Sequence, residues 1–123
     1  MLEPGDLANL FFNNLKITTV PAGTVIFRAE EKGSLMYTLI KGEVDLIVND
    51  QVVETIFEHD VFGQGALVQP DHTRASTAIA RTDCEMGELD REKFIFLVQE
   101  TPFFALEVIR SLSTRLRKMK GES

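Results

Sequence analysis

The sequence predicts a mainly β protein with α-helices at its two ends. From Ile17 to Glu88, short runs rich in β-branched and aromatic residues alternate with clusters of turn-forming residues. After Asp90 the apolar residues recur at helical spacing instead. Regularly spaced short strands are typical of a sandwich, a jelly roll or a barrel, so we expect such a β domain followed by C-terminal helices.

The strand runs are separated by recognisable turn signals. We expect strands within residues 17–20, 24–28, 35–40, 43–48, 51–57 and 75–81. Pro, Gly, Asn or Asp residues interrupt the pattern between the first five runs. The pair Asn49-Asp50 lies between two alternating runs and predicts the tip of a β-hairpin.

Three segments carry helical patterns. Asp6 can cap a short amphipathic helix over residues 7–15. Asp90 can cap a second helix over residues 91–100. Pro102 is suited to the first turn of a third helix, which we expect over about residues 102–120.

The last helix has an apolar stripe, with Arg115 and Arg117 expected elsewhere on its surface. This stripe can pack on the β domain or on the same helix of a second subunit, and both alternatives stay open. The second alternative predicts a homodimer. The stripe consists of Phe103, Leu106, Val108 or Ile109, Leu112 and Leu116.

Composition narrows the class of protein. A chain of 123 residues fits a single domain over residues 1–123. It has no apolar run of transmembrane length and no signal-peptide pattern, so we expect a cytoplasmic protein. The net charge of −6 argues against general nucleic-acid binding. The five bases of residues 110–120 fit a helix C-terminus better than a docking surface for an acidic partner.

Metal and catalytic chemistry have little support in the sequence. Only two histidines are present, His59 and His72, and we expect both on surface loops. The adjacent Asp71, His72 and Thr73 point in different directions and do not form a triad. Cys84 has no partner for an internal disulfide and is flanked by an acid on each side, so we expect a structural thiol.

The order of motifs resembles the cyclic nucleotide-binding domain of catabolite activator proteins, cyclic-nucleotide-dependent kinases and gated channels. The motifs are PAGTVIF, LMYTLIKGEV, DVFGQGAL, TRAST and ELDREKF, followed by a final helix after TP. The resemblance covers nearly the whole chain and implies an eight-stranded β-roll of jelly-roll type flanked by helices. It places a binding site for cAMP or cGMP at Phe62, Gly63, Gln64, Gly65, Ala66, Leu67, Arg74, Ala75 and Ser76.

The residue types at this implied site suit an anionic ligand. Gly63 and Gly65 allow positive φ and close backbone approach. Residues 65–68 can form a helical turn whose N–H groups point at an anion, and Arg74 can pair with a phosphate through two N–H donors. Leu67, by resemblance, would sense the ligand and transmit its presence to the C-terminal helices.

Three departures from the family pattern bear on function. Gln64 stands where the family has a glutamate that binds the ribose hydroxyl, which should weaken binding by roughly fivefold to tenfold. His59 stands where glycine is usual, which predicts a tighter or shifted turn. The chain stops at Ser123, so we expect no DNA-binding domain and a short lid over the base.

We therefore predict a non-enzymatic sensor that binds a cyclic nucleotide and signals through its C-terminal helices to an effector protein. One alternative is a ligand-free module for dimerisation or docking. A sensor of another phosphorylated ligand or of a cyclic dinucleotide is the other alternative, because it would also use Arg74.

Overall fold

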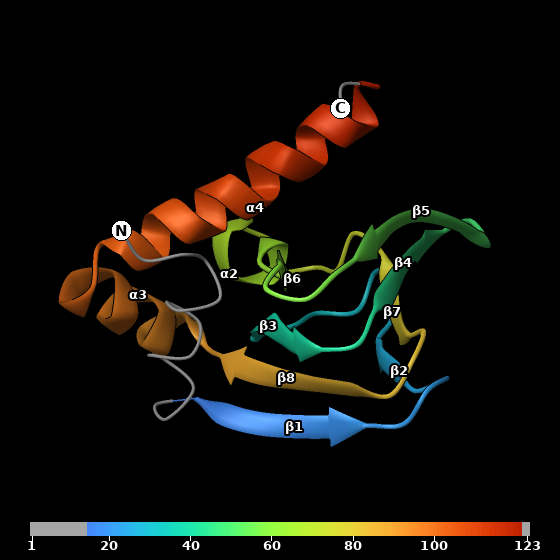
Figure 1. Cartoon of the computed structure of the whole chain (residues 1–123), viewed down its shortest axis with the longest axis horizontal. Helices are drawn as coiled ribbons and strands as arrows, with labels where there is room; N and C mark the ends of the chain where they lie inside the picture. The colour runs from blue at the N-terminus through green and yellow to red at the C-terminus, as the bar shows by residue number, and fades with distance from the viewer. Residues whose placement is uncertain (1–14, 122–123) are drawn as a thin grey trace.

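The structure is a computed structural model that describes residues 15–121. The helix predicted over residues 7–15 lies almost wholly outside the described residues. Within them, eight strands form two four-stranded antiparallel sheets, which confirms the predicted β-roll (Figure 1). The strands are β1 (Lys16–Val20), β2 (Val25–Phe27), β3 (Met36–Lys41), β4 (Val44–Val48), β5 (Gln51–Ile56), β6 (Val61–Phe62), β7 (Thr77–Ala80) and β8 (Cys84–Leu89).

Strands distant in sequence pair within both sheets. One sheet has the order β1-β8-β3-β6 and the other has the order β2-β7-β4-β5. β6 is therefore an edge strand of the first sheet, and β5 is an edge strand of the second. The chain crosses from the second sheet to the first between these two edge strands.

The roll is held together by an apolar core between its sheets. In β4 and β7 buried residues alternate with more exposed ones, as expected for sheets with one buried face, whereas the first four residues of β3 are all buried. The rings of Tyr37 and Phe62 stack with centroids 5.1 Å apart, and Phe27 lies 6.2 Å from each of them. This aromatic group anchors the strand that leads into the predicted ligand site.

Several turns use left-handed backbone conformations, and two of them bear on the sequence predictions. Asn49 and Asp50 have φ of 52° and 65°, and Val48 pairs with Gln51, which confirms the predicted hairpin tip. His59 has φ of 74°, the region that glycine occupies most readily. Its N–H donates to the carbonyl of Leu39 at 2.8 Å, so the turn is anchored to β3.

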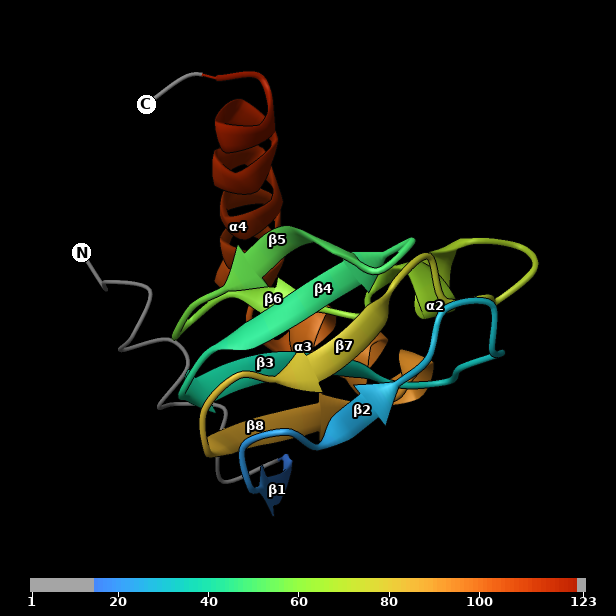
Figure 2. The same cartoon turned by 90° about the vertical axis from the view of Figure 1, so that its right-hand side faces the viewer.

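The helices lie along one side of the roll. They are α2 (Gly65–Val68), α3 (Arg91–Glu100) and α4 (Phe103–Met119). As predicted, Asp90 caps α3, accepting a hydrogen bond from the Lys93 N–H at 2.8 Å. α4 lies against β6, and its C-terminal part extends beyond the sheets while Arg115 contacts Glu54 of β5 (Figures 1 and 2). No helix within residues 15–121 has both the length and the apolar character needed to cross a bilayer.

One face of α4 is buried against the rest of the protein and the opposite face is exposed. Phe104 and Val108 are buried in a second apolar cluster with Leu67 and Leu97. The prediction that Arg115 lies on the surface is wrong, because its side chain is buried against the roll. Buried Ser111 precedes it by one helical turn. The inward face is therefore apolar near its start and polar near its end.

Candidate functional site

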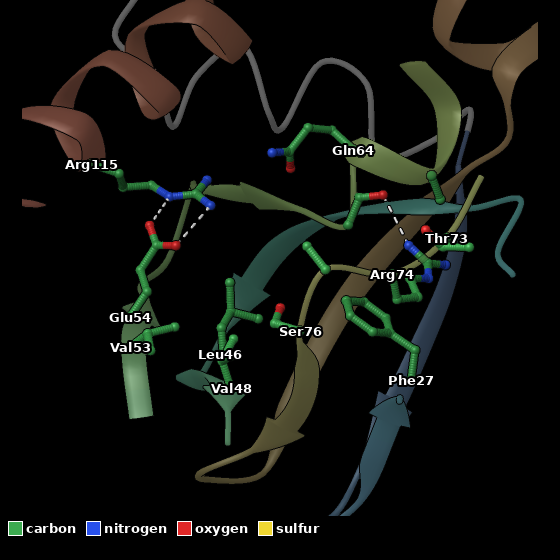
Figure 3. Close-up of a pocket in the computed structure, with 14 residues that line it drawn as sticks. Phe27, Leu46, Val48, Val53, Glu54, Gln64, Thr73, Arg74, Ser76 and Arg115 are labelled. Carbon is green, nitrogen blue, oxygen red and sulfur yellow. Dashed lines mark hydrogen bonds and ion pairs between the residues drawn. The ribbon is translucent and has the colours of Figure 1, made fainter. Parts of the chain in front are cut away.

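A pocket of about 260 Å³ opens between the turn that carries α2 and the second sheet (Figure 3). The β6–α2 turn forms one wall, β4 and β5 form another, and the segment leading into β7 closes the site. The lining residues are Phe27, Leu46, Val48, Val53, Glu54, Gly63, Gln64, Gly65, Ala66, Thr73, Arg74, Ala75, Ser76 and Arg115.

Arg74 is held at one end of this pocket by close packing. The residue is 6% exposed, and its guanidinium carbon lies 4.1 Å from the centre of the Phe27 ring. Nη1 donates a hydrogen bond to the Gly63 carbonyl at 2.9 Å. Gly33 lies against the other side, where a Cβ would stand only 2.4 Å from Arg74 Nε. Any side chain at position 33 would therefore displace the guanidinium.

The backbone of Arg74 is fixed as firmly as its side chain. Its N–H donates to the Glu31 carbonyl at 2.8 Å, and its carbonyl accepts from the Glu30 N–H at 2.8 Å. The Gly33 N–H also donates to the His72 carbonyl at 2.9 Å. These bonds join two loops that are distant in sequence, so the arginine is placed before any ligand arrives.

The charge of Arg74 has no direct counter-ion among residues 15–121. No carboxylate of the described chain lies within ion-pair distance of it, and its buried Nε has no hydrogen-bond partner. Burial lowers the pKa of Arg74, although Tyr37 and Glu31 oppose this effect. The pKa of Tyr37 is itself raised, mainly by burial, so this phenol is neutral at pH 7. A buried, uncompensated cation of this kind suits an anionic ligand.

Gln64 contributes the second unsatisfied polar group. Its Oε1 is buried without a hydrogen-bond partner, and buried acceptors are seldom left unpaired in folded proteins. Gly63, just before it, has φ of 76° as predicted, whereas Gly65 begins α2 without a positive φ. The N–H of Leu67 donates to the Gln64 carbonyl at 3.0 Å, so this N–H is not free for an anion, contrary to expectation.

The structure brings together most of the residues predicted for the site. Two of the predicted residues do not line the pocket. Phe62 is fully buried in the aromatic core of the roll, and Leu67 faces the helices instead. The predicted residues that do line it are Gly63, Gln64, Gly65, Ala66, Arg74, Ala75 and Ser76.

The opposite end of the pocket was not predicted. There Arg115 of α4 pairs with Glu54 of β5: Nε donates to Oε1, and Nη2 lies 3.4 Å from Oε2 (Figure 3). Arg115 Nη1 also donates to the Val61 carbonyl. Helical spacing could have predicted that Arg115 is buried, because it places this residue on the same helix face as three others. These are Phe104, Val108 and Ser111.

Ser111 extends this contact to the backbone of β6. Its hydroxyl donates to Asp60 Oδ1 at 2.9 Å and accepts from the Val61 N–H at 3.3 Å. Together with Arg115, it satisfies both polar groups of Val61 on the free edge of β6. Side chains of α4 therefore replace the missing neighbouring strand.

The remaining metal-binding and reactive side chains of residues 15–121 do not form a second site of this kind. Within residues 15–121, no three His, Cys, Asp or Glu side chains gather in a way that could hold a metal ion. His59 and His72 are exposed, as predicted, and His72 Nδ1 lies 2.8 Å from the Ala66 carbonyl. Cys84 is buried, with its sulfur 3.3 Å from the Glu43 carbonyl.

The fold and the pocket define a β-roll module that can hold a small anionic ligand next to its C-terminal helices. The family model of the cyclic nucleotide-binding domain matches residues 17–101. The chain therefore belongs to the cyclic nucleotide-binding domain family, as its motifs indicated.

The similar proteins are regulators of different kinds. The chain is 28% identical over 112 residues to the cAMP-activated global transcriptional regulator CRP of Pasteurella multocida, covering 87% of this chain and 54% of that protein. It is 37% identical over 89 residues to the cAMP-dependent protein kinase regulatory subunit of Eremothecium gossypii, covering 72% of this chain and 19% of the subunit. The chain thus spans about half of the first relative and a fifth of the second.

A solved structure supports the fold assignment. The c-di-GMP-responsive global regulator of Xanthomonas campestris superimposes with a TM-score of 0.79 at 24% identity. The match covers 92% of this chain and 59% of the regulator. At this level of identity, the likeness concerns the fold.

Proposed function

We propose that the protein is a regulatory module that binds a cyclic nucleotide and that Arg74 binds its phosphate. The observation that carries this proposal is the buried Arg74 guanidinium, which lines the pocket without a carboxylate partner in the described chain. A cyclic phosphate would supply the missing negative charge and accept hydrogen bonds from the guanidinium. Both curated relatives described above carry cAMP in their names and are regulators, which supports a regulatory role over a catalytic one.

Gln64 fits the role of a ribose-binding residue in this proposal. Its buried Oε1 needs a donor, and a ribose hydroxyl next to the phosphate would provide one. Ser76 lines the same pocket and carries a further hydroxyl that can donate or accept. The ligand would thus complete hydrogen bonds that the described residues leave open.

Two contacts offer a route from the pocket to the helices. Leu67, on the helix next to Gln64, packs in one apolar cluster with Phe104 and Val108 of α4. On the other side, β6 leads from Val61, held by α4, to Gly63, whose carbonyl accepts from Arg74. A ligand that shifts this turn would change the packing of α4, provided that it binds one helix arrangement more tightly than another.

The outward face of α4 supports a homodimer. Five large apolar side chains of this helix are each more than half exposed, which is unusual for a surface that stays in water. The same helix of a second copy is the symmetric partner that would bury them. These residues are Phe103, Leu106, Ile109, Leu116 and Met119.

Isothermal titration with cAMP and with cGMP tests the proposal, using nucleotide-free protein. We expect at least one of them to bind, and Arg74→Ala to weaken that binding by about 100-fold, because two charge-assisted hydrogen bonds are lost. Arg81→Ala is the matched control. It removes the same charge at an exposed ion pair with Glu43, away from the pocket, and should leave the affinity unchanged.

Two results would contradict the proposal. Equal affinity in wild type and Arg74→Ala would remove the phosphate role of this arginine. Failure of both nucleotides to bind would favour a docking module without a ligand, or a different phosphorylated ligand.

A further inference from the structure

The ion pair between Glu54 and Arg115 lies where the rest of a nucleotide would reach. In Figure 3 it stands across the pocket from Arg74, with the side chains of Leu46 and Val48 below the space between the two ends. If the phosphate is bound at Arg74 and the ribose near Gln64, then the base extends toward this ion pair. The apolar side chains of β4 suit the face of a flat ring, and the ion pair suits its polar edge.

Glu54 is fixed in this wall by its ion pair with Arg115. Its side chain is 14% exposed, and Arg115, at 9%, supplies a neighbouring positive charge. Arg115 is in turn held by the Val61 carbonyl and packed next to Ser111. A carboxylate offers about four acceptor positions, and the guanidinium occupies only some of them. The remaining positions are available to a ligand.

We propose that Glu54 makes this pocket selective for a guanine ring, an inference that depends on the cyclic nucleotide function proposed above. Guanine has two N–H donor groups side by side, N1–H and the N2 amino group, next to the acceptor O6. Oε2 of Glu54 is only loosely held, 3.4 Å from Arg115 Nη2, and this one oxygen can accept from both neighbouring donors. The guanidinium of Arg115 can donate to O6. The pair thus presents acceptors and donors in the order that this edge requires.

Adenine meets the same wall less well. Its ring N1 carries a lone pair and no hydrogen, so a carboxylate placed opposite would face another acceptor. Only the exocyclic amino group of adenine remains as a donor on this edge. Losing one hydrogen bond to a charged group corresponds to a preference for guanine of about tenfold or more.

The test is a set of titrations of wild type and Glu54→Gln with cGMP and cAMP. We expect wild type to bind cGMP at least tenfold more tightly than cAMP. In Glu54→Gln the side chain keeps its size but presents a donor in place of one acceptor, so the ratio should fall to about threefold or less. Thermal unfolding of each variant shows whether it is folded at the titration temperature.

Asp60→Asn is the matched control for indirect effects of α4. Asp60 accepts a hydrogen bond from Ser111 in the same contact between β6 and α4, but it does not line the pocket. This substitution should therefore leave the ratio of the two affinities unchanged. If Asp60→Asn lowered the ratio as much as Glu54→Gln does, selectivity would come from the position of α4, and the inference would be wrong.

The remaining outcomes separate this inference from the proposed function. Binding of cAMP as tight as that of cGMP, or an unchanged ratio in Glu54→Gln, would overturn the role of Glu54 and leave the cyclic nucleotide function in place. If neither nucleotide binds, both proposals are wrong.

Cyclic di-GMP carries the same ring, so it is the third titrant. Tighter binding of it, lost in Glu54→Gln, would support guanine selection and replace the mononucleotide by a dinucleotide.

Discussion

Arg74 and Arg115 are both buried in the same pocket, yet their surroundings differ. Arg115 is paired with Glu54 and also donates to a backbone carbonyl. Arg74 has one side-chain hydrogen bond, to Gly63, and no carboxylate partner in residues 15–121. The cost of burying a charge is therefore met within the protein at one end of the pocket and left for a ligand at the other. Substitutions that affect Arg115 should therefore lower the stability of the fold, and substitutions that affect Arg74 should weaken ligand binding.

The largest effect should be the loss of stability in Arg115→Ala, which breaks the ion pair with Glu54 at one end of the pocket. Removing this arginine leaves Glu54 and the Val61 carbonyl in the wall without their partner, and we expect the free energy of unfolding to fall by about 3 kcal/mol. Urea unfolding measures the change. Arg110→Ala on the same helix is the control, because that arginine is 41% exposed and should matter little. Equal losses in the two variants would contradict the distinction.

The next largest effect should be the loss of ligand affinity in Gly33→Ala. This substitution disturbs Arg74, at the other end of the pocket, without changing any charge. The added methyl group would meet the Arg74 guanidinium and push it out of place. We expect about tenfold weaker binding of the cyclic nucleotide in a titration. Thermal unfolding of Gly33→Ala shows whether the variant is folded at the titration temperature. A Gly33→Ala variant that binds like wild type would show that the position of Arg74 is not critical.

A smaller gain should follow from Gln64→Glu. A carboxylate accepts a stronger hydrogen bond from a ribose hydroxyl than an amide does, so we expect roughly fivefold tighter binding. Titration with the ribose nucleotide and its 2′-deoxy analogue measures the source of the gain. The deoxy analogue should show no gain, and an equal gain for both would place the ribose elsewhere.

The smallest effect concerns pH and the loop before Arg74. The pKa of Asp71 is lowered, chiefly because its carboxylate accepts a hydrogen bond from the Thr73 N–H at 3.1 Å. Its contribution to stability is therefore complete above the unfolded pKa, about 3.9, and is lost as the pH falls through the lower folded value. At pH 6, Asp71→Ala should have its unfolding midpoint at a slightly lower urea concentration than wild type. This difference should shrink as the pH falls below 4, and a difference that stays constant would rule out the charge as its cause.

The sequence predicted most of the roll because its signals are local. Alternating apolar residues marked six of the strands, and Asn49-Asp50 and Asp90 marked a turn and a helix start. β6 was missed because two residues show no period. β8 was missed because Gly87 and its acidic residues do not resemble a strand, although it pairs with both β1 and β3.

The candidate site was only half visible in the sequence. The turn at Gly63 and the single Arg74 could be predicted because their order and spacing match the family motif. A glycine turn or a lone arginine by itself is a weak signal. Glu54 and Arg115 could not be predicted in this way, because their pairing joins an edge strand to a helix 61 positions later in the chain. Gly33 was overlooked for a similar reason: its contact with Arg74 depends on two loops meeting in space.

The most direct measurement is a crystal structure of the protein in complex with the cyclic nucleotide that binds it more tightly. We expect the phosphate to lie against Arg74, with its oxygens accepting hydrogen bonds from the guanidinium, while Arg115 stays paired with Glu54. A phosphate bound to Arg115, or a ligand that leaves Arg74 without an anionic partner, would contradict this expectation.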